Sequence, residues 1–436
     1  MTPGRRTLLL LAIVAVVGAP AVLLRGLCVG RACDDSEGRA AKVPFCSLPQ
    51  ALRTRLVDGF RDGRSPDVLA VTGDTQVTSE ARSGGTWPSV AHTEAETVPI
   101  VFWGTGVAQG SLPEGTRLDR LAPTMAELIG LDRPHPEVRS GTALPEFHSA
   151  EPPRLAVVVA WKAIGSDDLE ADRGSWPFLQ SLIEEGRSTL AGDPGSLPLD
   201  PASILTTIGT GGLPRQHGIP AHLVRNEHGK LVRAWSKTAP VSVIATIGDD
   251  LDEVLHEGPK IGLVATDGSD RGLVGGEWYV DVDRDTVAIE PRDPGAAAVD
   301  MMADGFGTDA TPDLLAIAAD GSIEELDALL QVVADAAIEA ADGSVALVVT
   351  ATGSGEAPTA VDADEVVAAV EDNVAGRERV VEAAVPGGLF LDQRELAAAQ
   401  VSEDDILGAL RSIESKGAPL FADAFSGTAV SFAKYC

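Results

Sequence analysis

The feature that most constrains the fold of this 436-residue chain is a series of short apolar runs that close on glycine or a polar residue. They are PDVLAVTGD (66–74), ETVPIVFWGTG (96–106), RLAVVVAW (154–161), KIGLVATDG (260–268), PDLLAIAAD (312–320) and VALVVTATG (345–353). Continuous apolar runs of this length are typical of strands buried on both faces. Amphipathic segments such as 176–187 and 322–341 alternate with them. The alternation predicts an α/β fold, a doubly wound and mostly parallel sheet with helices on both faces.

Two other segments carry local predictions. LDRLAPTMAELIGL (118–131) has the apolar spacing of a helix, with Thr124 near its start. EWYVDVDRDTVAIE (277–290) alternates polar and apolar residues, which predicts an added hairpin.

The charge balance excludes one class of partner. The chain has 34 Lys and Arg against 65 Asp and Glu, a formal net charge of −31. Such a protein repels nucleic acid, so we expect no nucleic-acid partner. The ordinary consequence of this acidity is solubility.

The N-terminus predicts a membrane anchor. Arg5 and Arg6 precede an uncharged run over 7–24, which is near the lower limit for crossing a bilayer. The arginines place residues 1–6 in the cytoplasm and the rest outside it. We therefore expect a single-pass cell-membrane protein with a linker over 25–45 and an extracytoplasmic C-terminal domain. The small residues at 18–21 leave a cleaved signal peptide as the alternative.

All four cysteines, Cys28, Cys33, Cys46 and Cys436, would lie outside the cytoplasm, where disulfides persist. Four cysteines allow three pairings, and their spacing is unlike that of a zinc finger.

The segment SILTTIGTGGLPRQHGI (203–219) is the most informative motif. Together with RLAVVVAW and WPFLQSLIEEGR before it, it resembles the N-terminal part of the alkaline phosphatase superfamily, in particular the type I phosphodiesterases and nucleotide pyrophosphatases. The stretch from PDLLAIAAD to VALVVTATG resembles the middle of these proteins. ETVPIVFWGTG followed by LDRLAPTMAELIGL resembles their C-terminal part.

The order of these pieces differs from that of the family. Residues 46–150 match the C-terminal part, and 154–436 match the N-terminal and middle parts. The simplest account of this resemblance is one circularly permuted domain over 46–436, since permutation is tolerated where the original termini lie close together. The alternative is two incomplete domains side by side. The resemblance also implies a Cys46–Cys436 disulfide that joins the new termini, and a short Cys28–Cys33 loop.

The resemblance implies a site with two divalent metals held by Asp and His, and a Ser or Thr nucleophile. Several of these positions hold unsuitable residues here. Trp161 and Lys162 stand where the first carboxylate ligand belongs. Pro201 stands at the nucleophile position, with Asp200 before it and Ser203 after it as replacement candidates. Proline at the first helical position with Asp200 as N-cap predicts a plain helix start.

The remaining candidate site residues are scattered along the chain. Asp320 could serve as a metal ligand, but no histidine follows it closely; Asp74 and His92 are the other candidate ligands. His217 and His222 are candidates for binding, His217 mainly as a structural residue. We therefore expect no cofactor, and zinc or another divalent metal only if the protein is a hydrolase.

These features favour a membrane-anchored, extracytoplasmic protein of the alkaline phosphatase fold that is a pseudoenzyme. It would be a non-catalytic binding or scaffold module, with a cell-envelope protein as partner. One alternative is a divergent phosphodiesterase or nucleotide pyrophosphatase that hydrolyses phosphoric esters or pyrophosphate at a relocated site. Another is a purely structural ectodomain of a membrane complex.

Overall fold

The computed structural model describes residues 44–436 except 74, 76, 80–84, 92–95, 148–150, 237–238, 257, 277, 280–284, 356–360 and 375–378. The chain forms two compact units, Met1–Leu48 and Pro49–Cys436. In the first unit the described residues form the short helix α3 (Pro44–Ser47). The expected anchor over 7–24 and the Cys28–Cys33 pair lie outside the described residues. In the part that is described, no helix has the length and apolar character needed to cross a bilayer.

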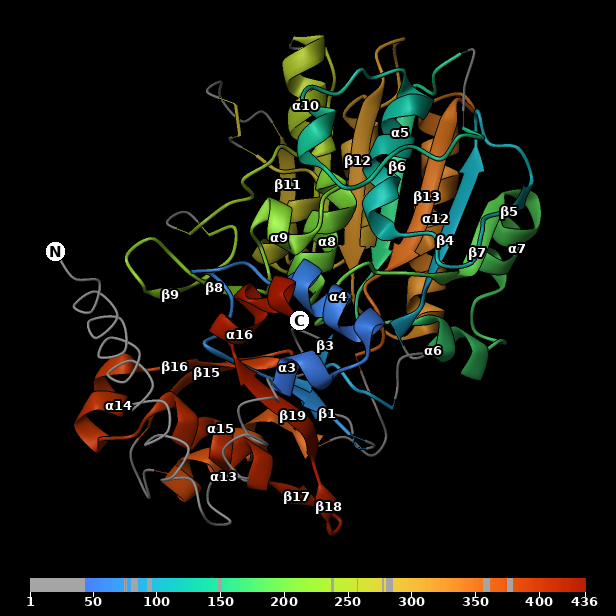
Figure 1. The fold of residues 1–436 in the computed structure, drawn as a ribbon. Helices are drawn as coiled ribbons and strands as arrows, with labels where there is room; N and C mark the ends of the chain where they lie inside the picture. Colours follow the sequence, from blue (N-terminus) through green and yellow to red (C-terminus); the bar gives the residue numbers. More distant parts are fainter. Residues whose placement is uncertain are drawn as a thin grey trace, which may run out of the picture. The chain divides into compact units, whose positions relative to one another are not determined.

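The unit Pro49–Cys436 is built around a large mixed sheet (Figure 1). Its eight strands lie in the order β11 (Thr286–Ile289), β10 (Ile261–Ala265), β12 (Asp313–Ala319), β6 (Leu155–Trp161), β13 (Val345–Ala351), β4 (Val98–Gly104), β7 (Arg187–Gly192) and β5 (Gly110–Ser111). From β11 to β13 all neighbouring strands are parallel. Strand β4 runs antiparallel to both β13 and β7. The sequence prediction of a mostly parallel sheet in an α/β fold is thus confirmed.

The three central strands carry the apolar runs seen in the sequence. Every residue of β6, β12 and β13 is buried, as expected for strands covered on both faces. Because these strands are parallel and in register, Trp161, Ala319 and Ala351 lie side by side at one edge of the sheet. The loops that follow these residues therefore meet at that edge.

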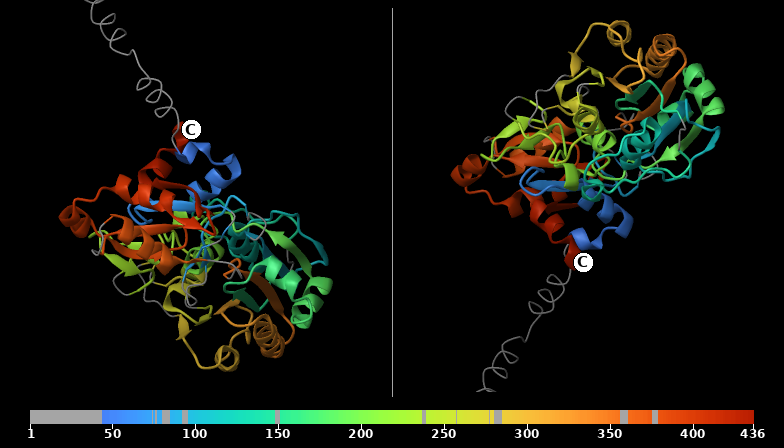
Figure 2. Two further views of the ribbon diagram at one scale, coloured as in Figure 1. Left: turned by 90° about the horizontal axis from the view of Figure 1, so that it is seen from below. Right: turned by 90° about the horizontal axis from the view of Figure 1, so that it is seen from above.

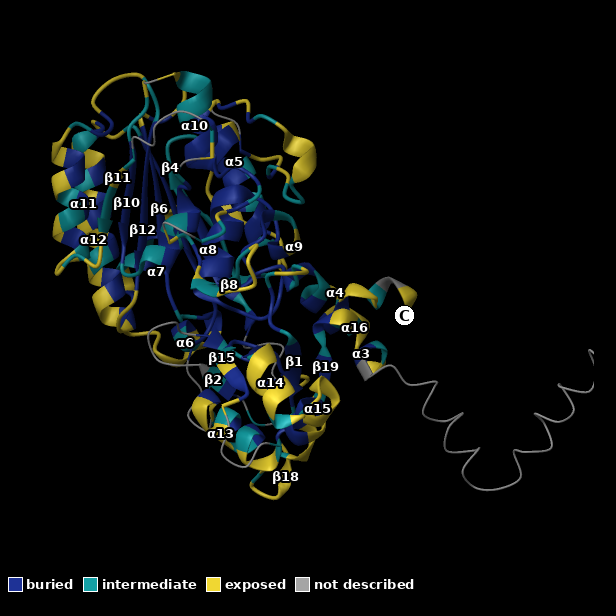
Figure 3. Cartoon of the chain, turned by 90° about the vertical axis from the view of Figure 1, so that its left-hand side faces the viewer, coloured by how far each residue is buried: buried dark blue, intermediate teal, exposed yellow. Residues whose placement is uncertain are grey.

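Helices cover both faces of this sheet (Figure 3). One face carries α7 (Pro177–Glu185), α11 (Pro294–Ala303) and α12 (Ile323–Ala340), and the other carries α5 (Leu121–Ile129), α8 (Pro201–Thr210), α9 (Pro214–His217) and α10 (Ile247–Leu255). The short helix α6 (Ser166–Ala171) follows β6, and the 3₁₀ helices η2 (Leu118–Arg120), η3 (Pro136–Val138) and η4 (Gly268–Leu273) lie in connections.

This unit also contains a smaller antiparallel sheet, and Figure 2 shows the molecule from two further sides. The smaller sheet contains β15 (Val381–Val385), β16 (Gly388–Leu391), β1 (Val68–Thr72) and β19 (Phe421–Ser426), in that order. Its associated helices are α13 (Ala363–Val374), α14 (Gln393–Ala399) and α15 (Glu403–Ser412). Strand β1 therefore pairs with strands that come more than 300 residues later, and not with the large sheet as its apolar run suggested.

The remaining elements of this unit are short. They are α4 (Gln50–Gly59), α16 (Gly427–Ser431), η5 (Ala433–Tyr435), and the strands β2 (Val77–Ser79), β3 (Gly85–Thr86), β14 (Val361–Asp362), β8 (Leu223–Arg225), β9 (Leu231–Arg233), β17 (Glu414–Ser415) and β18 (Ala418–Pro419). The described part of the segment 277–290 does not form the expected hairpin. Thr286–Ile289 form β11 instead, a strand at the edge of the large sheet that runs parallel to β10.

The expected disulfide between Cys46 and Cys436 is confirmed. It joins two residues that lie at opposite ends of the described chain. A bond of this kind stabilises a fold mainly by restricting the unfolded chain.

Helix α8 lies unusually close to η4, and glycines make this possible. A Cβ atom at Gly209 would lie 2.1 Å from the carbonyl oxygen of Gly272, and one at Gly272 would lie 2.1 Å from Thr206 Oγ1. Both distances are shorter than any real contact, so neither position can hold a larger residue unless the backbone moves. Backbone packing therefore requires glycine at position 209 of the 203–219 motif.

We predict that Gly209→Ala lowers the free energy of unfolding by about 1–3 kcal/mol, because the added methyl overpacks the contact between α8 and η4. Gly408→Ala is the matched control, since Gly408 lies in α15 with no atom near its Cβ direction. Better helix propensity should make that variant more stable by about 0.5–1 kcal/mol. Urea unfolding of both variants measures the difference, and a Gly209→Ala variant as stable as the wild type would contradict the packing argument.

Candidate functional site

A cavity of about 550 Å³ lies where the carboxyl ends of the parallel strands meet. This edge of an open α/β sheet is where such folds usually bind ligands. The residues that line the cavity come from the ends of β6, β10, β11 and β12, the start of α8 and the β8–β9 region. They are Lys162, Pro201, Ala202, His222, Arg233, Thr266, Asp267, Gly268, Ser269, Asp270, Glu290, Pro291 and Asp320.

The centre of the site is a buried ion pair between the ends of two strands. Lys162 directly follows β6, and its Nζ atom lies 2.9 Å from Asp270 Oδ2 and 3.3 Å from Thr266 Oγ1. Both charged side chains are at most 5% exposed. Burial raises the pKa of the Asp270 carboxyl to about 6, while the Lys162 ammonium acts in the opposite direction. At neutral pH the two groups therefore compensate each other's charge in a region with little water.

Asp270 is positioned by the turn that follows β10. Asp267 caps η4, accepting a hydrogen bond from Ser269 N, and its own backbone N–H donates to Asp270 Oδ2. Asp270 Oδ2 thus receives hydrogen bonds from both Lys162 and Asp267. The other carboxylate oxygen, Oδ1, is buried and has no hydrogen-bond partner among the described residues.

A second pair lies at the start of α8. Asp200 is the N-cap of this helix, and its Oδ1 accepts a hydrogen bond from Ala202 N at 3.0 Å. Its Oδ2 lies 2.7 Å from His222 Nδ1, so the imidazole donates to the carboxylate from Nδ1. The sequence prediction of Asp200 as N-cap before Pro201 is confirmed. The structure also brings together two candidates, Asp200 and His222, that lie 22 residues apart.

A third pair lies at the more exposed side of the cavity, where Arg233 Nη1 is 2.6 Å from Asp267 Oδ2. Asp320, the candidate that follows β12, lines the same cavity and is exposed. Glu290 also lines it, with a backbone φ of 51°. In the described part of the chain, neither Asp320 nor Glu290 is paired with a basic side chain.

The residues of this cavity do not fit a two-metal centre. Such a centre needs several Asp and His side chains directed at the same point. Here the Lys162 ammonium lies beside the buried carboxylate, and Asp200 already binds both a helix terminus and His222. Within the described residues, no group of three or more His, Cys, Asp or Glu side chains is arranged to hold a metal ion. The candidate ligands Asp74 and His92 lie outside the described residues.

The candidate residues Ser203 and His217 do not line the cavity. Ser203 is fully buried in the first turn of α8, and its Oγ has no hydrogen-bond partner within the described residues. His217 is fully buried at the end of α9. Its Nδ1 accepts a hydrogen bond from Ile219 N at 3.2 Å, so its Nε2 carries the proton and faces Thr207 Oγ1 at 3.1 Å. Neutral His217 thus links α8 to the following turn and is a structural residue.

Sequence reasoning missed Asp267, Asp270 and Arg233. A usable signal was present, because the segment ATDGSD places both aspartates directly after the strand 261–265. Applying the strand-end rule to every apolar run would have selected them together with Lys162 and Asp320.

Comparisons with known proteins give limited matches. No protein-family model matches the chain. Alkaline phosphatase PafA of Elizabethkingia meningoseptica is 26% identical over 88 residues, which are 20% of this chain and 16% of that protein. The calcium-transporting ATPase of Myroides odoratus is 31% identical over 106 residues, 23% of this chain and 18% of that protein. The chain thus spans less than a fifth of the length of each of these curated relatives.

Comparison of structures finds the same phosphatase. The crystal structure of wild-type alkaline phosphatase PafA has a TM-score of 0.42 and 14% identity, covering 61% of this chain and 77% of that one. A mutant of the same protein has a TM-score of 0.40 and 13% identity, covering 62% and 78%. The comparison of sequences and the comparison of structures thus both find a similarity to alkaline phosphatase PafA.

We predict that Lys162→Met destabilises the fold by about 3–5 kcal/mol, because it leaves Asp270 buried without a counter-charge. The double variant with Asp270→Asn in addition removes that unpaired charge, and should be more stable than Lys162→Met alone. Urea unfolding at pH 7.5 measures all three proteins. A Lys162→Met variant within about 1 kcal/mol of the wild type would show that the pair is not buried in solution, since exposed pairs contribute that little.

His217 gives the fold a defined pH dependence. Burial, with a smaller effect of the Arg64 and Arg61 charges, lowers the pKa of His217 to about 3. In the unfolded chain the imidazole takes up a proton below pH 6.5, whereas in the folded chain it stays neutral until about pH 3. The contribution of neutral His217 to the free energy of unfolding is therefore fully present above pH 6.5. It decreases as the pH falls below that value.

The variant His217→Gln should be less stable than the wild type at pH 7.5. Because the variant lacks the imidazole, this difference should shrink by about 2 kcal/mol between pH 7 and pH 5. Unfolding curves at several pH values measure it, and carboxylates common to both proteins cancel in the comparison. A difference that stays constant over this range would show that His217 titrates normally in the folded protein.

Proposed function

We propose that this chain is an alkaline-phosphatase-like protein that has become a non-catalytic binding or scaffold module. The sequence match to alkaline phosphatase PafA and the 203–219 motif support the relationship. The observation that carries the non-catalytic proposal is the Lys162–Asp270 pair at the strand ends. A protonated amine at this place repels a divalent cation and compensates the carboxylate that could have bound one.

A second observation concerns the nucleophile. In the superfamily that the sequence resembles, a hydroxyl lies just ahead of the helix that α8 matches. Here Pro201 occupies the first position of that helix and lines the cavity, and proline has no nucleophilic group. The nearest hydroxyl in sequence, on Ser203, is buried away from the cavity.

We also propose that the chain is a circular permutation of that fold. In support, β4 and α5, which come from the segment that resembles the family's C-terminal part, are integrated into the large sheet and its helical cover. Strand β4 pairs directly with β13, which comes from the part that resembles the middle of the family. The Cys46–Cys436 disulfide then joins the ends that the permutation created.

The anchor and the partner remain part of this proposal. The uncharged run over 7–24 behind Arg5 and Arg6 supports a single-pass membrane protein whose folded unit lies outside the cytoplasm. The disulfide fits that compartment. Such a module would act through a cell-envelope protein partner, and would need no metal to fold.

A divergent hydrolase is the alternative that one observation favours. The Asp200–His222 pair at the cavity resembles the acid–base pairs that activate nucleophiles, with Nε2 of His222 left as the proton acceptor. The pair would need a substrate hydroxyl or a water molecule as nucleophile, because no described side-chain nucleophile is placed against it.

Metal content and activity decide between the two proposals. We expect the purified full chain, after incubation with zinc and with manganese and removal of free ions, to hold far less than one ion per chain. It should hydrolyse bis-p-nitrophenyl phosphate no faster than a His222→Gln variant. Inductively coupled plasma mass spectrometry and nitrophenol absorbance are the measurements. Stoichiometric metal, or hydrolysis abolished by His222→Gln, would establish the hydrolase instead.

A further inference from the structure

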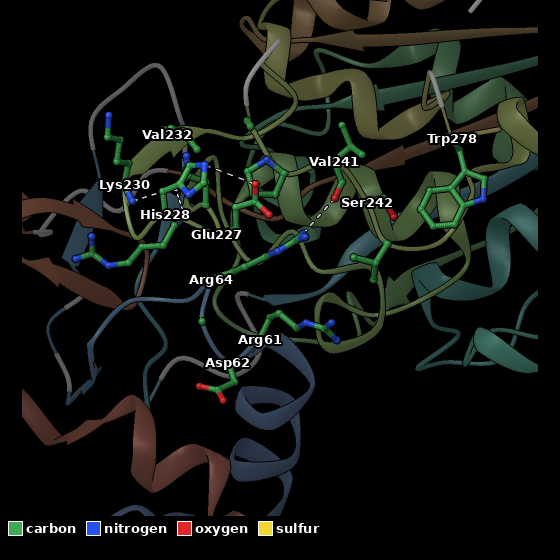
Figure 4. A pocket seen from close by; sticks show the side chains of 16 residues that line it. Arg61, Asp62, Arg64, Glu227, His228, Lys230, Val232, Val241, Ser242 and Trp278 are labelled. Atoms are coloured by element: carbon green, nitrogen blue, oxygen red, sulfur yellow. Dashed lines mark hydrogen bonds and ion pairs between the residues drawn. The ribbon is translucent and has the colours of Figure 1, made fainter. Parts of the chain in front are cut away.

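A second and larger cavity lies away from the strand ends and has a different electrostatic character (Figure 4). It has a volume of about 1,030 Å³ and is formed by the loop after α4, the β8–β9 hairpin, the segment 239–243 and Trp278. Its basic lining residues are Arg61, Arg64, Arg225, His228 and Lys230, and its acidic ones are Asp62 and Glu227. A cavity with this lining is unexpected in a chain with a net charge of −31.

Within the described residues, two of these guanidinium groups, those of Arg61 and Arg64, have no charged partner. Arg61 Nη1 donates to the carbonyl oxygen of Arg215 at 2.8 Å. Arg64 Nη1 donates to the carbonyl oxygens of Gly218 at 2.7 Å and Val241 at 3.1 Å. These acceptors are neutral, and in the described part of the chain no carboxylate lies within ion-pair distance of either arginine. The positive charge of both side chains therefore remains uncompensated.

Arg225 shows the contrast within the same cavity. Its two terminal nitrogens lie 2.9 Å from Asp67 Oδ2 and 3.0 Å from Glu382 Oε2, so its charge is fully compensated. Of the acidic lining residues, Glu227 is 87% exposed and lies beside His228. In Figure 4 the carboxylate of Asp62 points away from Arg61 and Arg64.

The charges of Arg61 and Arg64 affect the pKa values of nearby groups. Burial, and next the nearby charge of Arg61, lowers the pKa of the Arg64 guanidinium. Both arginines also contribute to the lowered pKa of His217. Like charges held together without a counterion destabilise the fold, and an anion bound between them would relieve that repulsion.

One side of this cavity is apolar and accessible. Trp278 lines it with 40% of its surface exposed, and Val241 is 43% exposed. Figure 4 shows the indole beyond Val241 and Ser242, on the side opposite to Lys230 and His228. An exposed indole offers a flat surface on which a ring can stack.

We propose that this cavity binds an oxyanion group, a phosphonate, phosphate or carboxylate, carried on a molecule with a flat ring. Arg61 and Arg64 hold the oxyanion through charge-assisted hydrogen bonds, and Trp278 packs against the ring. This proposal does not depend on whether the strand-end cavity is catalytic.

Phenylphosphonate is the probe, because it combines both groups and has no ester bond to cleave. We expect the full chain to bind it in isothermal titration calorimetry at low ionic strength, with a change in tryptophan fluorescence. Arg61→Gln should weaken binding about tenfold, the effect of losing one hydrogen bond to a charged group. Arg173→Gln is the matched control, since it removes the same charge from an exposed residue that does not line the cavity, and should change the affinity little.

Further ligands separate the two halves of the proposed site. Trp278→Leu should weaken phenylphosphonate roughly threefold to tenfold and leave methylphosphonate unaffected. Benzoate in place of phenylphosphonate tests whether a carboxylate serves as well as a phosphonate. Should Arg61→Gln fail to fold, Lys230→Gln removes a cation from the opposite wall and is expected to weaken binding several-fold.

Three outcomes would overturn the proposal. The first is the absence of detectable binding at 10 mM phenylphosphonate. The second is an equal loss of affinity in Arg61→Gln and Arg173→Gln, and the third is an affinity that depends on neither Arg61 nor Lys230. The last result would place the anion elsewhere, for example in the strand-end cavity. None of these outcomes bears on metal content or hydrolysis, so this proposal and the proposed function can fail separately.

Discussion

The buried contact between Lys162 and Asp270 determines how the carboxyl edge of the large sheet is arranged. Removing two charges from water costs several kcal/mol for each, and only a close partner with further hydrogen bonds offsets that cost. The pair therefore requires the end of β6 and the turn after β10 to stay in register across β12, which lies between them. The packing of α8 against η4, with no space for a side chain at Gly209 or Gly272, holds that turn from the other side.

The two cavities differ in whether their basic side chains have acidic partners. At the strand ends each central basic group has an acidic partner from the same chain: Lys162 with Asp270, Arg233 with Asp267, and His222 with Asp200. Such internal pairing leaves little net charge for an ion or an anionic ligand to neutralise. In the larger cavity, the partners of Arg61 and Arg64 among the described residues are neutral carbonyl groups. Ligand recognition by charge is therefore better supported there than at the site where the fold would place it.

The sequence predicted the features that depend on local physics. Buried runs specify β6, β12 and β13, and Asp200 before Pro201 specifies the start of α8. The pairing of distant strands was not predictable from the residues, whereas the Cys46–Cys436 disulfide was predicted because the family resemblance implied it. The run at 66–74 forms a buried strand, as predicted, but β1 lies inside the small antiparallel sheet, because apolar character does not identify the neighbouring strand. Asp270 could have been selected by its place after a strand, but its pairing with an amine 108 residues away follows only from the fold.

The Cys46–Cys436 bond makes the stretch from residue 46 to the C-terminus a covalently closed ring. A protease that cuts one peptide bond within this ring leaves the two resulting segments joined by the disulfide and releases no fragment. Two cuts are needed before any piece can leave. A single cut in a surface loop would therefore leave the two sheets tethered and able to re-pack, with no gain in the entropy of separated chains.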